Sequence, residues 1–144
     1  MTDTELTDAQ LANRLRLAVS RLHRRIRLAS NDIPPLQLSS LVSIEQHGPL
    51  RLGELAQREA VTAPTMTRVL AALDERGLIV RAPDPDDARS TRVSLAAAGV
   101  RALTDVRSRR TALLDARLAR LTDAERAALV AAMPALEALI HADS

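Results

Sequence analysis

Residues 83–95 read PDPDDARSTRVSL, which opens with two prolines and three aspartates and closes on an alternating, strand-like run. Just upstream, residues 78–80 (LIV) form another short run of β-formers. Two short apolar runs joined by a Pro/Asp-rich segment predict a β-hairpin with a long tip. Arg89 falls in this tip. An arginine at the most exposed point of a hairpin supports no core, so its presence there suggests a binding partner.

A helix is predicted directly before the hairpin, from Thr62 to Gly77. Thr62 is a favourable N-cap, proline is tolerated in the first helical turn, and glycine commonly follows a helix end. The apolar residues recur at the i, i+3, i+4 and i+7 spacing of one buried face; they are Met66, Val69, Leu70 and Leu73. The opposite face points outward and carries Pro64, Thr67, Arg68 and Ala71, with Thr65 on its flank.

A shorter helix, predicted over residues 52–59, precedes this one. Two helices joined by a tight turn follow the helix-turn-helix plan, in which the second helix enters the DNA major groove with its N-terminal residues leading. Short threonine side chains allow close approach to base edges, and Arg68 can bind a guanine edge or a phosphate. Without the hairpin, the outward residues would fit an ordinary solvated surface better than a DNA-binding one.

The hairpin shifts the balance toward DNA binding. A hairpin directly after a helix-turn-helix forms a wing, whose tip would lie beside the minor groove that flanks the second helix. The negative potential of a narrow minor groove attracts inserted arginine, which gives Arg89 a role. We interpret Asp87 as the local partner that orients the Arg89 guanidinium. Asp84 and Asp86 are assigned to ordinary turn chemistry.

Long amphipathic helices are predicted on both sides of this region. The first begins at a capping box formed by Thr7 and Gln10 and ends near Ala29. It carries six arginines and no acidic residue between positions 9 and 31. A further helix, from Leu36 to His47, is predicted before the helix-turn-helix.

After the hairpin, a helix over residues 96–121 leads into a second capping box, formed by Thr122 and Glu125. The last helix is expected to end near Ala142 and to bend at Pro134. Together these patterns predict a mainly α-helical fold with a small β-hairpin wing.

We expect a single domain of residues 1–144 with a winged helix-turn-helix core over residues 34–96. The flanking segments, residues 6–30 and 97–142, carry more apolar surface than one small winged helix can cover. Exposed apolar stripes of that size are usually interfaces. The sequence therefore predicts a homodimer built on these two segments.

Composition excludes several classes of function. The chain has no cysteine and no aromatic residue, which removes thiolate chemistry and aromatic stacking. All 20 basic residues are arginine, yet the formal net charge of +2 is too small to indicate nucleic-acid binding by itself. The histidines at positions 23, 47 and 141 are widely separated, and no nucleophile motif or phosphate-binding glycine loop is present. We expect no enzymatic activity, cofactor or metal.

The N-terminal residues MTDTELTDAQ are acidic and polar, unlike a signal peptide. Charge-free runs such as Ala127 to Leu136 are too short to span a bilayer. These features predict a soluble cytoplasmic protein that does not bind membranes.

Residues 53–99, GELAQREAVTAPTMTRVLAALDERGLIVRAPDPDDARSTRVSLAAAG, resemble the DNA-binding core of MarR-type winged-helix regulators. The match lies in the family's Leu-x-x-x-Gly-Leu-x-x-Arg, Asp-x-Arg and Leu-Thr-x-x-Gly patterns, although Ala96 stands where the family commonly has threonine. By this resemblance, Asp87 and Arg89 occupy the positions of the wing Asp-x-Arg motif, and Arg81 matches the arginine before the wing. Thr65, Thr67 and Arg68 fall on the recognition helix.

The resemblance implies a homodimer that binds a short pseudo-palindromic DNA operator, usually as a repressor released by a small ligand. It places the ligand near the first, second and fifth helices, where Arg16, His23 or Arg24 would anchor an organic anion among aliphatic side chains. A different class of function stays open, namely a winged-helix dimer that acts through protein–protein contacts without DNA binding. Retention on duplex DNA that falls steeply with salt would distinguish the two.

Overall fold

The computed structural model describes residues 5–29 and 33–141. Along the chain the elements are α1 (Asp8–Ala29), α2 (Pro35–His47), β1 (Leu50–Arg51), α3 (Leu52–Arg58), α4 (Ala63–Glu75), β2 (Ile79–Pro83), β3 (Thr91–Leu95), α5 (Ala97–Leu118) and α6 (Asp123–Ile140). The predicted fold class, mainly α-helical with a small β wing, is confirmed. The predicted ends at residues 30 and 142 lie outside the described residues, and α6 continues past Pro134 to Ile140.

Local signals place most of the helix ends. At the start of α1, the Thr7 amide donates to Gln10 Oε1 at 2.9 Å and the Gln10 amide donates to Thr7 Oγ1 at 3.2 Å, as a capping box requires. Thr122 and Glu125 make the same reciprocal pair before α6. Gly48, which follows α2, has φ +72°, a conformation that glycine adopts at little cost.

The hydrophobic core lies in one lobe, formed by α2, α3, α4, the sheet and the first half of α5. Its largest fully buried side chains include Leu41, Leu55, Met66, Leu70, Leu73 and Leu103. All four residues of the apolar stripe predicted for α4 are buried. This packing holds the helix-turn-helix, α3 and α4, against the sheet as one unit.

The sheet is antiparallel with strand order β1-β3-β2. The predicted hairpin is formed by β2 and β3, with Val80 opposite Ser94 and Arg81 opposite Val93. Strand β1 is not predicted from the sequence; it adds only two residues on the other side of β3. A strand of two residues is too short to show the alternation by which strands are recognised.

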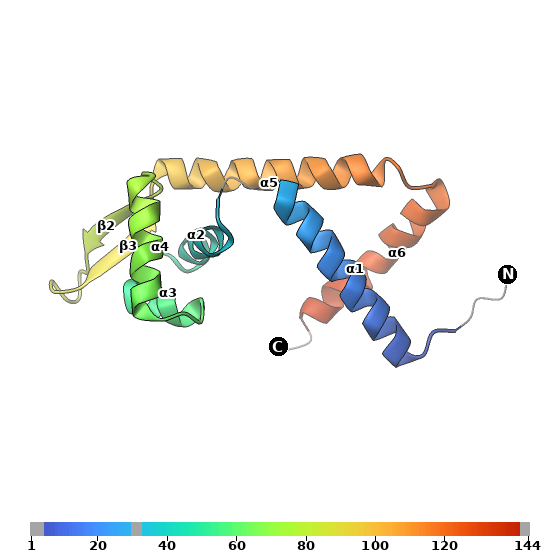
Figure 1. Cartoon of the computed structure of the whole chain (residues 1–144), viewed down its shortest axis with the longest axis horizontal. Helices are drawn as coiled ribbons and strands as arrows, with labels where there is room; N and C mark the ends of the chain where they lie inside the picture. Colours follow the sequence, from blue (N-terminus) through green and yellow to red (C-terminus); the bar gives the residue numbers. More distant parts are fainter. Residues whose placement is uncertain (1–4, 30–32, 142–144) are drawn as a thin grey trace.

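The remaining helices extend away from the lobe (Figure 1). Helix α5 leaves the lobe as a long straight rod, α1 contacts α5 beyond it, and α6 turns back from the far end of α5. Neither α1 nor α6 contains a buried residue. Within the described residues, none of the helices combines the length and apolar character needed to cross a membrane.

The start of α5 packs tightly against the residue before the wing. The Ala96 amide donates to the Leu78 carbonyl oxygen at 3.0 Å. Gly99 is buried over the same carbonyl, and a Cβ atom built on Gly99 would lie 2.2 Å from the Leu78 oxygen. The close approach of this helix to the sheet therefore depends on the absence of a side chain at position 99.

Candidate nucleic-acid interface

The outward face of α4 is short-chained and accessible. Pro64, Thr67, Arg68 and Ala71 are exposed, and Thr65 is partly buried on the flank. Thr62 caps the helix by accepting a hydrogen bond from the Thr65 amide at 3.4 Å. The Thr67 hydroxyl donates to the Ala63 carbonyl at 3.0 Å, which leaves its methyl group and oxygen lone pairs available to a base edge.

Arg68 is the charged group of this face. It has no hydrogen-bond or ion-pair partner within the described part of the chain. An exposed arginine without an internal partner can turn toward a guanine edge or a phosphate without breaking a protein contact.

The wing tip is held together by its own hydrogen bonds. The Asp84 amide donates to the Ser90 carbonyl at 2.9 Å, and the Ser90 amide donates to the Asp87 carbonyl at 2.9 Å. The Asp87 carboxylate accepts the Arg89 backbone amide at 3.0 Å and the Ser90 hydroxyl at 3.2 Å. These contacts make the tip a compact loop that presents Arg89.

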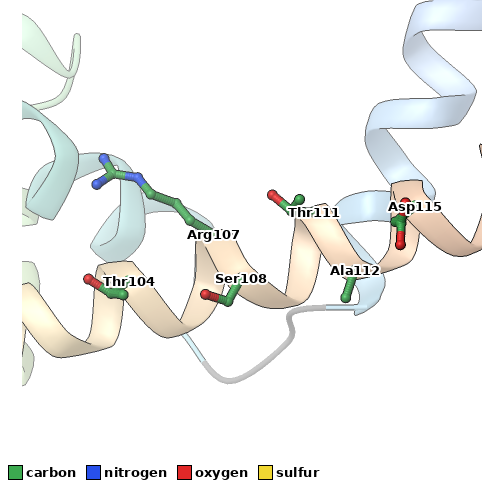
Figure 2. Close-up of a pocket in the computed structure, with 6 residues that line it drawn as sticks. All are labelled: Thr104, Arg107, Ser108, Thr111, Ala112 and Asp115. Atoms are coloured by element: carbon green, nitrogen blue, oxygen red, sulfur yellow. The ribbon is translucent and has the colours of Figure 1, made fainter.

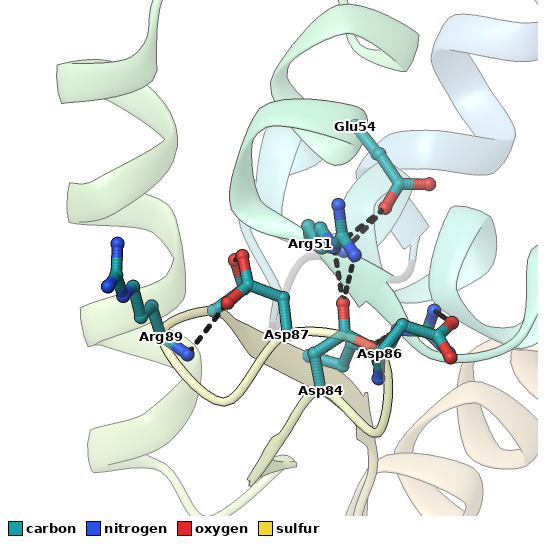
Figure 3. Close-up of polar contacts among 8 residues, drawn as sticks. Arg51, Glu54, Asp84, Asp86, Asp87 and Arg89 are labelled. Carbon is teal, nitrogen blue, oxygen red and sulfur yellow. Dashed lines mark hydrogen bonds and ion pairs between the residues drawn. The ribbon is translucent and has the colours of Figure 1, made fainter.

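The role predicted for Asp87 toward the Arg89 guanidinium is wrong. Figure 3 shows the Asp87 carboxylate bonded to the backbone nitrogen of Arg89, with the guanidinium turned away. The short aspartate side chain reaches the amide two residues ahead, as in an Asx-turn, before it can reach the end of the arginine side chain. Asp87 therefore shapes the backbone of the tip and leaves the guanidinium exposed to a partner.

Asp84 does more than the turn chemistry assigned to it. Its Oδ1 accepts the Asp86 amide at 3.0 Å, as a turn residue would. However, its side chain is fully buried, where Oδ2 accepts a hydrogen bond from Arg51 Nε at 2.5 Å (Figure 3) and Oδ1 lies 3.3 Å from Arg92 Nε. Asp86, by contrast, is 82% exposed and approaches Arg92 only at 3.6 Å.

These contacts shift two ionisation equilibria. The Asp86 amide, followed by the Arg51 guanidinium, lowers the pKa of Asp84 below its ordinary value, against the opposing effect of burial. The hydrogen bond to Asp84 raises the pKa of Arg51. Asp84 is therefore a charged carboxylate at neutral pH, positioned between two guanidinium groups.

A second ion pair joins the wing to the helix-turn-helix. Arg81, on β2, lies 3.5 Å from the Asp74 carboxylate near the end of α4. This pair is half exposed, so its contribution to stability is small. The pair nevertheless turns the Arg81 side chain toward α4, whereas Arg89 at the tip points outward.

A cleft of about 370 Å³ lies among α1, α2 and α5. It is lined by His23, Arg27, Leu28, Ile33, Pro35, Leu38, Ser39, Val42 and Arg110. Of the predicted ligand anchors, His23 lines this cleft, whereas Arg16 and Arg24 do not. Arg16 instead donates to the Asn13 side chain at 2.9 Å.

A wider hollow of about 540 Å³ runs along α5 alone. Figure 2 shows its lining residues along this helix, with Arg107 extending toward α2. The Arg107 guanidinium binds both carboxylate oxygens of Glu45, and this contact lowers the pKa of Glu45. Only α5 lines this hollow, and Arg107 is already paired with Glu45. The hollow therefore resembles a surface groove more than a binding site.

Comparison with known proteins agrees with this architecture. The model of the MarR family matches residues 33–91. The chain is 40% identical to the HTH-type transcriptional regulator Mb0904 of Mycobacterium bovis over 136 residues, covering 93% of this chain and 95% of that protein. It is 28% identical to the HTH-type transcriptional repressor MdtR of Bacillus subtilis over 122 residues, 81% of this chain and 79% of that one.

A solved structure shows the same arrangement over nearly the whole chain. A transcriptional regulator of Pseudomonas aeruginosa superposes with a TM-score of 0.78 at 37% identity, covering 97% of this chain and 98% of the other. A helix-turn-helix followed by an antiparallel wing is the winged helix-turn-helix fold, and the relatives that share it are transcriptional regulators. The chain belongs to the MarR family of these regulators.

Proposed function

We propose that the protein binds double-stranded DNA as a homodimer and represses transcription until a small organic anion releases it. The observation that carries this proposal is the pairing of two exposed elements in one lobe. The outward face of α4 has the short side chains that a major groove admits, and the wing tip presents Arg89 beyond it. A regulator of this kind acts on the chromosome, so we place it in the cytoplasm.

In this proposal the DNA-contacting residues divide by role. Pro64, Thr65 and Thr67 bring the start of α4 close to the bases, and Arg68 binds a guanine edge or a phosphate. Arg89 enters the adjacent minor groove. Asp87 holds the backbone of the tip in the required shape.

The surface area of the chain supports a dimer. The chain exposes 10533 Å², whereas a compact monomer of this mass exposes about 7,200 Å². The excess, roughly 3,300 Å² for one chain, exceeds the roughly 1,000–2,500 Å² that each partner contributes to an obligate dimer interface, so the chain has ample surface for one. Exposed apolar residues lie on α1 and α6, neither of which contains a buried residue; among them are Leu11, Val19, Leu22, Val130, Met133 and Ile140. We therefore assign residues 6–30 and 97–142 to dimerisation and residues 34–96 to DNA binding.

We expect sedimentation equilibrium to give twice the chain mass of 15.6 kDa at micromolar concentration. Val130→Glu should shift the protein toward monomer, because Val130 is 61% exposed on α6 and a buried interfacial charge is costly. Val80→Glu is the control, since Val80 is 47% exposed on β2, in the segment assigned to DNA binding and outside the dimerisation segments. A wild-type protein that stays monomeric would contradict the dimer.

The cleft among α1, α2 and α5 supports the ligand. Its aliphatic walls fit an apolar body, while Arg27 and Arg110 supply positive charge and His23 a hydrogen-bonding group for a carboxylate. The cleft lies between the proposed dimerisation helices and the DNA-binding lobe. Occupying it can change the spacing of the two α4 helices, which one turn of B-DNA sets at about 34 Å.

We expect salicylate or an aliphatic carboxylate of similar size to weaken DNA binding by about 5- to 150-fold, a typical coupling between sites. Arg110→Gln should raise the concentration required, because it removes a positive group from the cleft. Arg16→Gln, on α1 but outside the cleft, should leave it unchanged. If no such acid releases DNA up to millimolar concentration, regulation by protein level becomes the simpler account.

The test of DNA binding is a gel-shift series with duplex fragments from the promoter of the protein's own gene. A specific complex whose affinity falls steeply with salt supports the proposal. Failure to retain any duplex at low salt would favour the alternative, a winged-helix dimer that acts through protein–protein contacts.

A further inference from the structure

Two arginines lie opposite each other on neighbouring strands of the sheet, an arrangement that brings two positive charges together. Arg51 on β1 pairs with Arg92 on β3 in the strand register. Like charges directly opposite one another in neighbouring strands are destabilising. Here the Asp84 carboxylate contacts both guanidinium groups, and its own side chain is fully buried. A single buried carboxylate thus bridges the two arginines and offsets their repulsion.

The three residues belong to parts of the molecule with different tasks. Arg51 immediately precedes α3, the first helix of the helix-turn-helix. Asp84 begins the wing-tip loop, and Arg92 lies on the strand by which the chain leaves that loop. The ion cluster Arg51–Asp84–Arg92 therefore connects the helix-turn-helix to the base of the wing tip.

The tip beyond this cluster is closed by hydrogen bonds of its own. The Asp84 amide donates to the Ser90 carbonyl, and the Asp87 carboxylate holds the Arg89 amide and the Ser90 hydroxyl. Because the tip is compact, its orientation relative to α4 depends strongly on how its base is held. The Asp84 contact with Arg51 links that base to the helix-turn-helix. The Arg81–Asp74 pair, by contrast, is half exposed and joins β2 to α4 away from the tip.

We propose that Asp84 and Arg51 are positioning residues that set DNA affinity without contacting DNA. They fix the wing tip so that Arg89 and the outward face of α4 meet the duplex together. Ordering the wing before binding lowers the entropic cost of binding, which raises affinity. This inference rests on the DNA binding proposed above.

A positioning role for Asp84 and simple electrostatics predict opposite changes in DNA affinity when the Asp84 charge is removed. A carboxylate near DNA repels phosphate, so removing its charge should tighten binding or leave it unchanged. If Asp84 positions the wing, removing its charge should instead weaken binding. Asp86 is the matched control, because it lies two residues away in the same loop, carries the same charge and is 82% exposed.

The experiment compares Asp84→Asn and Asp86→Asn in the full-length protein, titrated against a duplex that the wild type binds. We expect Asp84→Asn to bind roughly tenfold more weakly with an unchanged log–log salt slope, since it loses no phosphate contact. Asp86→Asn should bind as tightly as the wild type or more tightly. An Asp84→Asn protein that keeps or exceeds wild-type affinity would overturn the proposal.

A second variant covers the case in which Asp84→Asn does not fold. Arg51→Lys keeps the charge but loses the planar guanidinium fork that holds the carboxylate. It should also lower affinity at an unchanged salt slope, and wild-type affinity in this variant would count against the proposal.

Amide hydrogen exchange tests the link without DNA. The Asp84 and Ser90 amides, both hydrogen-bonded within the tip, should exchange faster in Arg51→Lys while amides in α4 stay protected. Unchanged exchange at the tip would reject the positioning role. A wild-type protein that binds no duplex, but whose tip loosens in Arg51→Lys, would reject the proposed function and retain the mechanical link.

Discussion

Replacing Gly99 by alanine is expected to destabilise the fold by about 3 kcal/mol or more, a large effect for one methyl group. The new Cβ would lie 2.2 Å from the Leu78 carbonyl oxygen and 3.2 Å from its carbon. Both atoms are backbone, so relief requires the start of α5 to move away from the sheet. That movement would also strain the hydrogen bond from the Ala96 amide to the same carbonyl.

Gly53 provides the matched control for the Gly99 prediction. It is also helical, in α3, but nothing lies within 4 Å of a Cβ built on it. Alanine there should stabilise the protein by up to about 1 kcal/mol, because it lowers the backbone entropy of the unfolded chain.

Thermal or urea unfolding of the two variants at equal protein concentration measures the difference, since dimerisation would make stability concentration-dependent. We expect Gly99→Ala to lower Tm and Gly53→Ala to raise it slightly. Equal, small effects of both substitutions would show that α5 does not need the close approach to Leu78.

The elements predicted well from the sequence are those whose signals are local. Both capping boxes join residues three positions apart, so their partners are visible in the sequence itself. The buried face of α4 follows from a repeated spacing within one helix. The wing was likewise indicated by a local contrast between β-forming runs and a Pro/Asp-rich turn.

The ion cluster at the base of the wing could not be predicted in the same way. The bond from Arg51 to Asp84 spans 33 positions. It depends on the register of β1 with β3, and β1 has only two residues and no periodicity of its own. In the sequence, Asp84 is one aspartate among three in a turn, with nothing local to indicate its burial.

The residues that line the cleft were likewise only partly predictable from the sequence. His23 was predicted from its place on a helix near the expected ligand site, and it lines the cleft. Arg27 and Arg110 were not predicted, because they meet there only through the way α1 and α5 pack on each other. Which arginine of a six-arginine helix faces a cleft is decided by helix rotation, and α1 has no buried residue that would set its rotation relative to α2 and α5.

Substituting Arg89 by alanine is expected to weaken DNA binding by about 1–3 kcal/mol while leaving the fold intact. The Arg89 guanidinium has no partner within the described part of the chain, so its loss should change the free energy of unfolding by roughly 0.5 kcal/mol or less. In the complex, the same group would lie in the strong negative potential of a narrow minor groove. Its removal should also flatten the log–log salt slope by about one unit per wing.

The control for Arg89→Ala is Arg120→Ala, which removes the same charge just beyond the end of α5 that lies away from the wing (Figure 1); because Arg120 lies in a dimerisation segment, the variant is first shown to be a dimer. Its affinity and salt slope should stay close to those of the wild type, because a charge more than a Debye length of about 10 Å from the DNA is largely screened.

The salt slope distinguishes the role of Arg89 from that of Asp84. Loss of Arg89 should reduce both affinity and slope, whereas loss of the Asp84 charge should reduce affinity alone. Unchanged affinity in Arg89→Ala would mean that the wing does not reach DNA, and α4 would then carry recognition by itself.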